Sequence, residues 1–198
     1  TSRRHRVCPM SSTPATLPSA RFNGTALLPQ LGVIRAQGED AAKFLHGQLT
    51  QDFSLLGLSE ARLAAFCSSK GRMQASFVGF KRAPDDILLV CPRDVLPATL
   101  KRLSMFVMRA KAKLSDASDV FQVWGLAGSA APQAGATWSK SGEAESAQTV
   151  MLPPADGVPR ALWVAPAELP PPAGERLPES IWAWLEVRGG VASVSLPI

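Results

Sequence analysis

The stretch Phe66–Met73, which reads FCSSKGRM, decides how the sequence around it is interpreted. Short apolar segments flank it at 62–68 and 73–80, and a polar link that contains Gly71 joins them. Two apolar runs of this length, separated by a few turn residues with a glycine, are typical of a β-hairpin. We therefore predict two adjacent strands with Gly71 in the turn.

The residues before this hairpin predict a strand followed by a helix. Residues 26–36 alternate loosely between apolar and other side chains, which favours one strand. Residues 38–40, Gly-Glu-Asp, then place acidic groups where a helix begins, and apolar residues recur at helical spacing over 41–49. One face of this helix should lie on a sheet.

The residues after the hairpin alternate between strand and helix patterns. Residues 93–109 predict the clearest helix, because Pro97 falls in its first turn, where proline is tolerated. A later helix over 178–187 should turn Trp182 and Leu185 inward. The strand patterns in this part of the chain cover residues 86–91, 111–114, 120–126 and 160–164.

This order of elements predicts an α+β fold, with mixed or antiparallel sheets covered by helices. Residues 127–155 are rich in Gly, Ala, Ser and Pro, so we expect a surface region with little core of its own. We predict a disordered arm over 1–25, with Met10 as its candidate start, then a first subdomain over 26–126 and an incomplete second subdomain over 127–198.

Positive charge is concentrated in one block of the sequence. The chain has a net charge of +5, and residues 70–113 hold ten Lys and Arg against three Asp. Such a block attracts anions, but charge alone does not distinguish a phosphate backbone, a ligand with several carboxylates and a solvated face. All three interpretations stay open at this point.

Several classes of protein are disfavoured because their patterns are absent. The sequence contains no GxGxxG, no GxxxxGK followed by Ser or Thr, no HExxH and no GxSxG, and its longest aliphatic cluster is 87–90. Cys8, Cys67 and Cys91 form no CxxC pair and have no metal-ligand spacing to a histidine. We expect a soluble, cytoplasmic protein with an inert thiol at Cys67, no metal site and no assignable catalytic residue.

Other polar and aromatic side chains have structural interpretations. His46 has no paired carboxylate or cysteine nearby in the sequence, so we interpret it as a helix-surface or half-buried residue. Asp85 and Asp86 are interpreted as turn residues, because neighbours on a strand point to opposite faces. Of the tryptophans, Trp182 should pack in the core, and Trp184 is the candidate for exposure.

Three stretches of the chain resemble one protein family. Residues 44–52 read FLHGQLTQD, residues 67–73 read CSSKGRM and residues 184–191 read WLEVRGGV. In this order they resemble the FLQGQLTND stretch, the C-D-x-K-G-K/R-M turn and the helix with a terminal glycine turn of YgfZ, a family of bacterial folate-binding proteins. The resemblance extends over residues 26–192.

The resemblance implies a fold, a cofactor and a role. The fold is that of the folate-binding domain of the glycine-cleavage aminomethyltransferase, whose subdomains surround a central tetrahydrofolate site. The role is that of an accessory protein in iron–sulfur cluster assembly or repair, and through it in tRNA modification, with iron–sulfur client enzymes as partners. Our candidate folate contacts are Lys70 and Arg72 for anionic groups, Gln48 and Asp52 for polar groups, and Arg188.

These candidates have a structural alternative, in which Gln48 and Asp52 end a helix and Lys70 and Gly71 turn the hairpin. The chain also departs from the transferase pattern. Residues 72–76 lack the aspartate that serves the folate chemistry, and Arg188 stands where the transferase tends to have a glutamate. Both losses argue against one-carbon transfer, so an active tetrahydrofolate-dependent aminomethyltransferase is the disfavoured alternative.

A second alternative is a basic nucleic-acid-binding module over 70–113. No recognised binding motif accompanies this charge, so direct nucleic-acid binding is not expected. The segment K-G-C-Y/F-x-G-Q-E, which carries the reactive cysteine of the YgfZ family, does not occur in the sequence. We therefore expect a chain truncated before the C-terminal barrel of that family.

Overall fold

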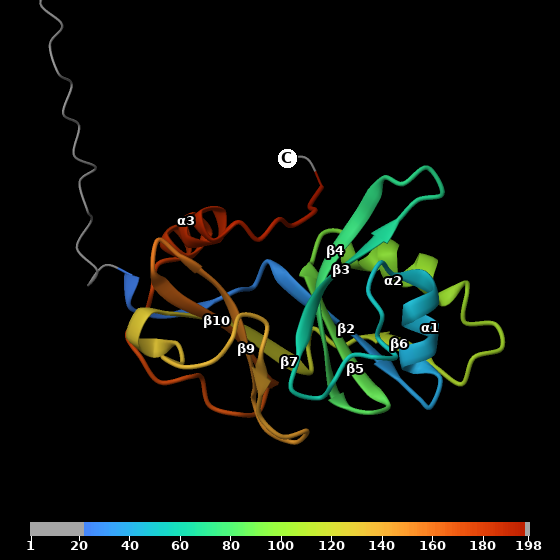
Figure 1. Ribbon diagram of the computed structural model, residues 1–198, viewed down its shortest axis with the longest axis horizontal. Coiled ribbons are helices and arrows are strands. Elements are labelled where there is room, and N and C mark those ends of the chain that lie inside the picture. The colour runs from blue at the N-terminus through green and yellow to red at the C-terminus, as the bar shows by residue number, and fades with distance from the viewer. Residues whose placement is uncertain (1–21, 197–198) are drawn as a thin grey trace, which may run out of the picture.

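The computed structural model describes residues 22–196, which form ten β-strands and three α-helices (Figure 1). Most of the expected arm, with Met10 and Cys8, lies outside the described residues. Its last part belongs to the fold, because Phe22 is buried and stacks on Trp184 with ring centroids 5.2 Å apart.

The first sheet is antiparallel, with the strand order β3-β4-β5-β2-β6. Helices α1 (Ala41–Gln48) and α2 (Leu96–Ser104) cover one of its faces (Figure 1). Its strands are β2 (Leu31–Gln37), β3 (Ala61–Cys67), β4 (Met73–Ala83), β5 (Asp86–Pro92) and β6 (Lys113–Asp116).

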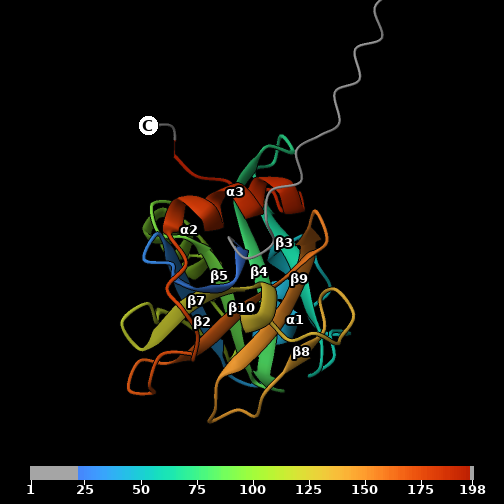
Figure 2. The ribbon, with the colours of Figure 1, turned by 90° about the vertical axis from the view of Figure 1, so that its left-hand side faces the viewer.

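The second sheet is also antiparallel, with the order β1-β7-β10-β9-β8. Helix α3 (Glu179–Gly189) lies across it (Figure 2). A Cβ atom added at Gly125 would lie 2.5 Å from the Trp182 ring, so glycine lets α3 approach β7 this closely. The strands are β1 (Gly24–Leu27), β7 (Phe121–Ala127), β8 (Lys140–Ser141), β9 (Gln148–Ala155) and β10 (Val158–Pro166).

Two apolar clusters hold these layers together. One joins the inner faces of both sheets to α3, and it contains Leu88 of β5 and Leu162 of β10. The other lies between the first sheet and its two helices, and it contains Leu89 and Leu45. Strand β5 serves both clusters because successive strand residues point to opposite faces, which explains its uninterrupted apolar sequence. The predicted α+β class, with antiparallel sheets covered by helices, is confirmed.

The hairpin predicted from Phe66–Met73 is also confirmed. Strands β3 and β4 pair in antiparallel register, with Phe66 opposite Ala75. The Ser68 carbonyl accepts a hydrogen bond of 2.9 Å from the Gly71 amide, and Gly71 has φ +74°. This left-handed conformation is one that glycine adopts without steric cost.

The single strand predicted over 26–36 is wrong, because the structure divides it between two sheets. Strand β1 ends at Leu27 and pairs with β7, whereas β2 begins at Leu31 and pairs with β5. Pro29 and Gln30 form a turn between them. Proline lacks an amide hydrogen and favours turns, so it interrupts the strand.

Two further boundaries differ from expectation. Helix α2 ends at Ser104 rather than at 109, and the next residues, Met105 and Phe106, are exposed. The region 127–155 was expected to have little core, but β9 lies in it and buries Val150 and Leu152. Its alternating pattern is short and contains two prolines near its end, which hides the strand.

Sheet pairing crosses the expected subdomain boundary at residue 126. Strands β1 and β7 come from the first predicted subdomain, yet they lie in the same sheet as β9 and β10 of the second. The division of the chain into subdomains over 26–126 and 127–198 stays a prediction.

Candidate functional site

A small cavity of about 40 Å³ lies where the two sheets meet the C-terminal end of α3. Its walls are mostly apolar and come from strands of both sheets, and polar groups reach it from Ser76 and Glu186. A cavity needs roughly 10–15 Å³ to hold one water molecule, so this one has room for a few. The lining residues are Leu31, Leu63, Ser76, Phe77, Val78, Val90, Cys91, Pro92, Leu152, Leu162, Glu186, Val191, Ala192 and Ser193.

The segment that follows α3 covers this cavity. Val191, Ala192 and Ser193 line it, and two hydrogen bonds then hold the chain against β4 and against the turn between β5 and α2. The amide of Val194 donates to the Ser76 hydroxyl at 2.8 Å, and the amide of Leu196 donates to an Asp94 carboxylate oxygen at 2.7 Å. The covering segment, residues 191–196, therefore has few attachments and no secondary structure.

Glu186 is the carboxylate of this site. It projects from α3, and burial raises the pKa of its carboxyl group, while the positive charge of Arg160 acts in the opposite direction. Glu186 is half-buried, so its carboxylate is partly shielded from water beside the apolar cavity wall.

Arg160 lies on β10, and its charge acts on Glu186. Its side chain is fully buried, its Nε donates to the Pro153 carbonyl at 3.1 Å, and its guanidinium carbon lies 5.5 Å from the Trp182 ring centroid. Its two terminal nitrogens have no hydrogen-bond partner among the described residues. Burial lowers the pKa of Arg160, and the charge of Glu186 opposes that effect.

Cys91 also lines the cavity but offers no reactive group. Burial raises the pKa of its thiol to about 12, so the thiol stays neutral. Cys67 is half-buried, and neither cysteine is part of a disulfide. Across residues 22–196, His, Cys, Asp and Glu form no group of three or more that could hold a metal ion.

Lys70 and Arg72 lie at the exposed tip of the β3–β4 hairpin, outside the cavity. Ser76, however, lines the cavity from β4, the strand that follows the hairpin tip, four residues after Arg72. At ~3.3 Å per strand residue, the hairpin tip is about 13 Å from the cavity wall. A ligand of that length that leaves the cavity along β4 would reach these two cations.

Gln48 and Asp52 lie near the C-terminal end of α1. Asp52 Oδ1 accepts hydrogen bonds from the amides of Ser54 and Leu55 at 2.8 and 3.1 Å, which stabilises the turn after the helix. The same oxygen lies 3.3 Å from His46 Nδ1, a pairing that the sequence separation did not suggest. These contacts fit the alternative in which Asp52 ends the helix. That Gln48 and Asp52 contact a folate stays a prediction.

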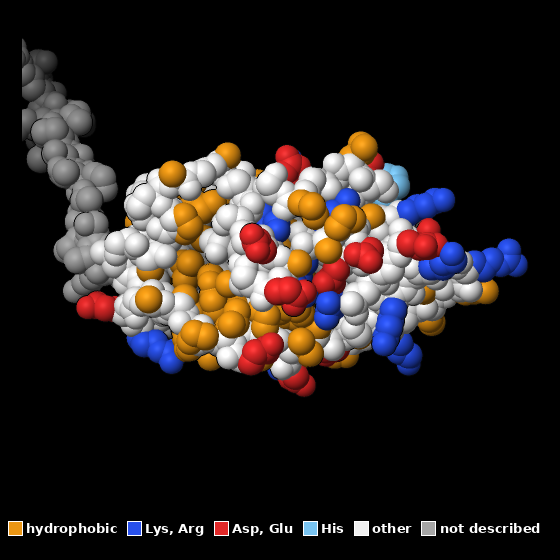
Figure 3. All heavy atoms as spheres, turned by 90° about the horizontal axis from the view of Figure 1, so that it is seen from below, with side chains coloured by type: hydrophobic (Ala, Val, Ile, Leu, Met, Phe, Trp, Pro, Cys, Tyr) orange, Lys and Arg blue, Asp and Glu red, His pale blue; other side chains and the backbone are white. Residues whose placement is uncertain are grey.

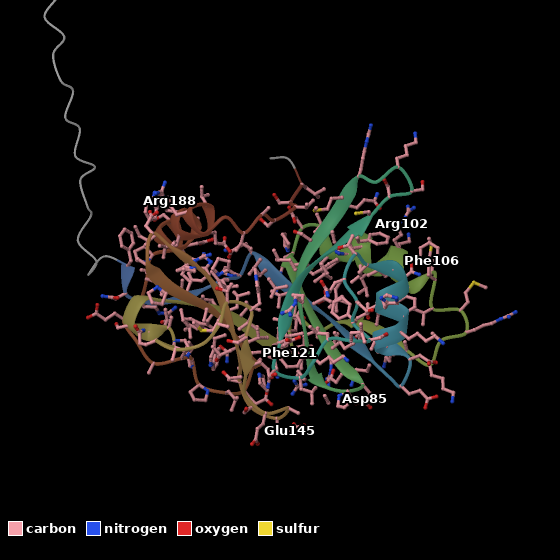
Figure 4. All side chains as sticks on the ribbon, in the orientation of Figure 1. Asp85, Arg102, Phe106, Phe121, Glu145 and Arg188 are labelled. Atoms are coloured by element: carbon pink, nitrogen blue, oxygen red, sulfur yellow. The ribbon has the colours of Figure 1, made fainter. Side chains whose placement is uncertain are left out.

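Arg188 lies on the outer side of α3, far from the hairpin (Figure 4). It forms a bidentate ion pair with Asp156, with both N–O distances 2.7 Å, and its guanidinium lies 5.7 Å from the Trp184 ring centroid. None of the five candidate contacts lines the cavity. The structure therefore does not bring them together, and their role in binding stays a prediction.

Sequence reasoning missed Glu186 and Arg160. Glu186 lies within the stretch 184–191, four residues after the buried Trp182 and on the same face of α3. That helical spacing was the signal that could have identified a half-buried carboxylate. Arg160 had no such signal, because the pattern of β10 alone does not show which face the helix covers.

Comparison with known proteins gives sequence matches to part of the chain. An uncharacterized protein of Haemophilus influenzae is 36% identical over 101 residues, which is 51% of this chain and 35% of that protein. A tRNA-modifying protein YgfZ of Photorhabdus laumondii is 31% identical over 126 residues, 64% of this chain and 36% of that protein. The YgfZ protein of Colwellia psychrerythraea is 31% identical over 93 residues.

The chain is a distant homologue of YgfZ proteins. The homology covers about half of the chain and about a third of the length of these relatives. No family model matches the sequence. The predicted resemblance to YgfZ is thus confirmed at low identity.

A solved structure supports the same fold. The glycine cleavage system aminomethyltransferase T from Bartonella henselae superposes with a TM-score of 0.64 at 12% identity, over 75% of this chain and 44% of that one. The chain therefore has the aminomethyltransferase folate-binding-domain fold. No helix in the described part of the chain is long and apolar enough to cross a membrane.

Proposed function

We propose that this protein binds a reduced folate and acts as an accessory protein in iron–sulfur cluster assembly or repair, and through it in tRNA modification. The observation that carries the folate part is the apolar cavity with one carboxylate, Glu186, between the two sheets of an aminomethyltransferase-type fold. The names of the YgfZ relatives motivate the cellular role.

The chemistry of the cavity suits the pterin ring of a folate. Pterin is a flat heterocycle, and one edge of it presents an amino group beside a ring N–H. A carboxylate such as Glu186 accepts both hydrogen bonds in one plane, while apolar side chains such as Leu152 and Leu162 contact the ring faces. The glutamate tail would follow β4 toward Lys70 and Arg72, our proposed contacts for its carboxylates.

Binding of a whole folate requires the covering segment, residues 191–196, to move. Ligand pockets typically measure ~300–1,000 Å³, far more than the present cavity. Residues 191–196 are the weakest part of the wall, because they are held mainly by the hydrogen bonds to Ser76 and Asp94. We therefore expect folate to displace this segment rather than enter beneath it.

A titration with folinic acid, a stable formylated tetrahydrofolate, tests the proposal. We expect saturable binding by calorimetry, weakened about tenfold or more by Glu186→Gln, since a hydrogen bond to a charged group contributes ~1.5–3 kcal/mol. Asp94→Ala should tighten binding, because it releases Leu196 without altering the cavity wall. Absence of binding at millimolar folinic acid would overturn the folate assignment.

The iron–sulfur role needs a separate test in cells. Deletion of the gene should lower the activity of iron–sulfur enzymes and the level of tRNA modifications that depend on them, and the wild-type gene should restore both. Complementation by Glu186→Gln should be weaker than by the wild type if folate binding serves the role. Equal complementation would separate the two parts of the proposal.

The two alternatives have their own readouts. One-carbon transfer would produce a methylene-folate product from an aminomethyl donor, and the absence of an acid over residues 72–76 makes us expect none. Direct RNA binding would show a steep loss of affinity with salt. Exposed Lys and Arg side chains project from the end of the molecule that the first sheet and its helices form (Figure 3), so this control belongs with any binding assay.

A further inference from the structure

A groove of about 350 Å³ lies between the β3–β4 hairpin and helix α2. We call it the hairpin–helix groove. It shares no lining residue with the cavity between the two sheets, and Arg102 of its helix wall lies beside the hairpin (Figure 4). The hairpin contributes Phe66 and Gln74 to its lining, and the helix side contributes Ala98, Thr99, Lys101, Arg102 and Met105.

The hairpin–helix groove is positively charged on both sides. Lys101 and Arg102 line its helix wall and are exposed, and no Asp or Glu lines it. Lys70 and Arg72 are exposed at the tip of the hairpin that forms the other wall. Within residues 22–196, none of these four side chains forms an ion pair with a carboxylate.

The lack of partners is a property of this groove rather than of every surface cation. Lys111, in the loop after α2, pairs with Glu39, and Arg62 of β3 pairs with Glu60. Cations that face a groove without acids of its own attract acidic groups from another molecule. The charge therefore indicates an anionic occupant.

The rest of the groove wall is apolar and adaptable. Met105 is 58% exposed where α2 ends, and Phe106 and Met108 after it are exposed as well. A methionine side chain is flexible and polarizable, so exposed methionines adjust to the side chains of a binding partner. An occupant of this groove therefore gains from an apolar side chain as well as from negative charge.

These two properties favour a protein segment over other anionic partners. Single-stranded nucleic acid binds through bases that stack on exposed aromatic rings, but the aromatic residue that lines the groove, Phe66, is only 5% exposed. A lipid surface is flat, whereas this site is hollowed between a hairpin and a helix. A groove of this kind suits a short segment with an apolar side chain on the side that faces it.

We propose that the hairpin–helix groove binds an acidic segment of a partner protein. An apolar side chain of the segment lies against Met105, and its carboxylates pair with Lys101 and Arg102 at the rim. Lys70 and Arg72 extend the positive field along the hairpin. This interaction surface is separate from the cavity between the sheets, so it does not depend on folate binding.

The test uses a fluorescein-labelled amphipathic peptide of about 15 residues, the length at which an isolated helix begins to form. Leucines at helical spacing form one face of the peptide, and glutamates occupy the other positions. Fluorescence anisotropy with the full chain should show saturable binding that weakens as salt is added. Peptides with Gln in place of Glu, or with Ser in place of Leu, should each bind more weakly, because each loses one of the two interactions.

Variants of the groove show whether the peptide binds there. Lys101→Gln and Arg102→Gln should each weaken binding about threefold, and Met105→Gln by at least as much. Ala98→Glu should weaken it most, because it places an acid one helical turn before Arg102. The matched control is Lys43→Gln, which removes an exposed charge from α1 and should leave the affinity unchanged.

Three results would overturn the inference. The first is equal affinity of wild type, Ala98→Glu and Met105→Gln for the peptide, with circular dichroism showing that all three are folded. The second is binding of an oligouridine RNA, or of vesicles that contain phosphatidylserine, that these variants weaken while the peptide does not bind. The third is a dimer in sedimentation that Ala98→Glu dissociates, which would assign the groove to a second copy of the chain.

Discussion

The first sheet and the second sheet each bury an arginine near a carboxylate, but the two arrangements differ. In the first, Asp86 receives two bonds of 2.8 Å from Arg35 and one of 3.0 Å from Arg82. Arg82 also donates to the Ala144 carbonyl and lies 4.9 Å from the Phe121 ring centroid. In the second, Arg160 has one hydrogen bond and two unpaired nitrogens, and its counter-charge faces a cavity.

The number of hydrogen bonds left unmade separates structural charges from functional ones. A network whose hydrogen bonds are nearly all made, as around Asp86, has little capacity left for a ligand and contributes mainly to order. A charge pair with unmade bonds beside a cavity, as at Arg160 and Glu186, costs stability unless a ligand completes it. Variants at four places in the molecule test that contrast, from the largest expected effect to the smallest.

The largest effect should come from breaking the satisfied network. Asp86→Ala leaves Arg82 buried without its carboxylate, and removal of one partner of a buried pair typically costs about 3–5 kcal/mol. Urea unfolding measures the loss. Asp85→Ala is the matched control, because Asp85 is exposed in the adjacent turn, and the two variants should differ by most of that amount. Equal stability of the two would show that the network contributes nothing.

The next effect concerns the way α3 rests on the second sheet. Gly125→Ala places a Cβ atom 2.5 Å from the Trp182 ring, and overpacking of this kind costs about 1–3 kcal/mol. Tryptophan fluorescence and urea unfolding report it. The control is Gly47→Ala in α1, where nothing lies within 4 Å, and it should stabilise the protein by about 0.5–1 kcal/mol. A neutral Gly125→Ala would mean that α3 moves easily.

A smaller effect, opposite in sign to that of Asp86, is expected at Glu186. Burial raises the pKa of Glu186 in the folded protein, so between the unfolded and the folded pKa the folded state binds more protons than the unfolded state. Stability therefore falls as the pH rises through that interval. Glu186→Gln removes that loss. Above neutral pH the variant should therefore unfold at a slightly higher temperature than wild type, with the difference vanishing in acid. A lower midpoint at alkaline pH would place Glu186 with the structural charges.

The smallest effect should come from the surface pair of Asp156 and Arg188. Arg188 holds the pKa of Asp156 below its usual value in the folded protein. Any stability that the pair contributes is therefore present above the pKa of the unfolded carboxyl group, and it is lost as the pH falls through the lower pKa of the folded state. Asp156→Asn keeps a residue that tolerates the local φ of +49°, and the thermal midpoint at neutral pH should be unchanged. A clear decrease that salt abolishes would show that this pair anchors α3.

Local patterns predicted most of the elements correctly. The hairpin, α1 and β5 follow from side-chain periodicity and from Gly71, whose effect is local in the chain. The split at Pro29 was missed although its cause is also local, because a loose alternation outweighed the proline. Strand β9 was missed because its small residues and prolines resemble a loop, and only pairing with β10 over its whole length makes it a strand.

The candidate site was predicted less well than the fold. The resemblance identified the family, yet the five residues chosen for binding lie on the hairpin tip, at the end of α1 and on the outer side of α3, away from the cavity. They were chosen by residue type within matching stretches. Such matching cannot show which side chains converge, because convergence depends on how distant elements pack.

By itself the sequence determined the α+β class, the hairpin and the kinship with YgfZ proteins, because these depend on short-range periodicity and on residues adjacent in the chain. The packing of distant elements buries Arg160 of β10 completely and brings Glu186 of α3 to the wall of a cavity. Their charges act on one another through space. Whether a charge is solvated, paired or held ready for a ligand depends on burial, and burial exists only after the sheets and the helix have packed.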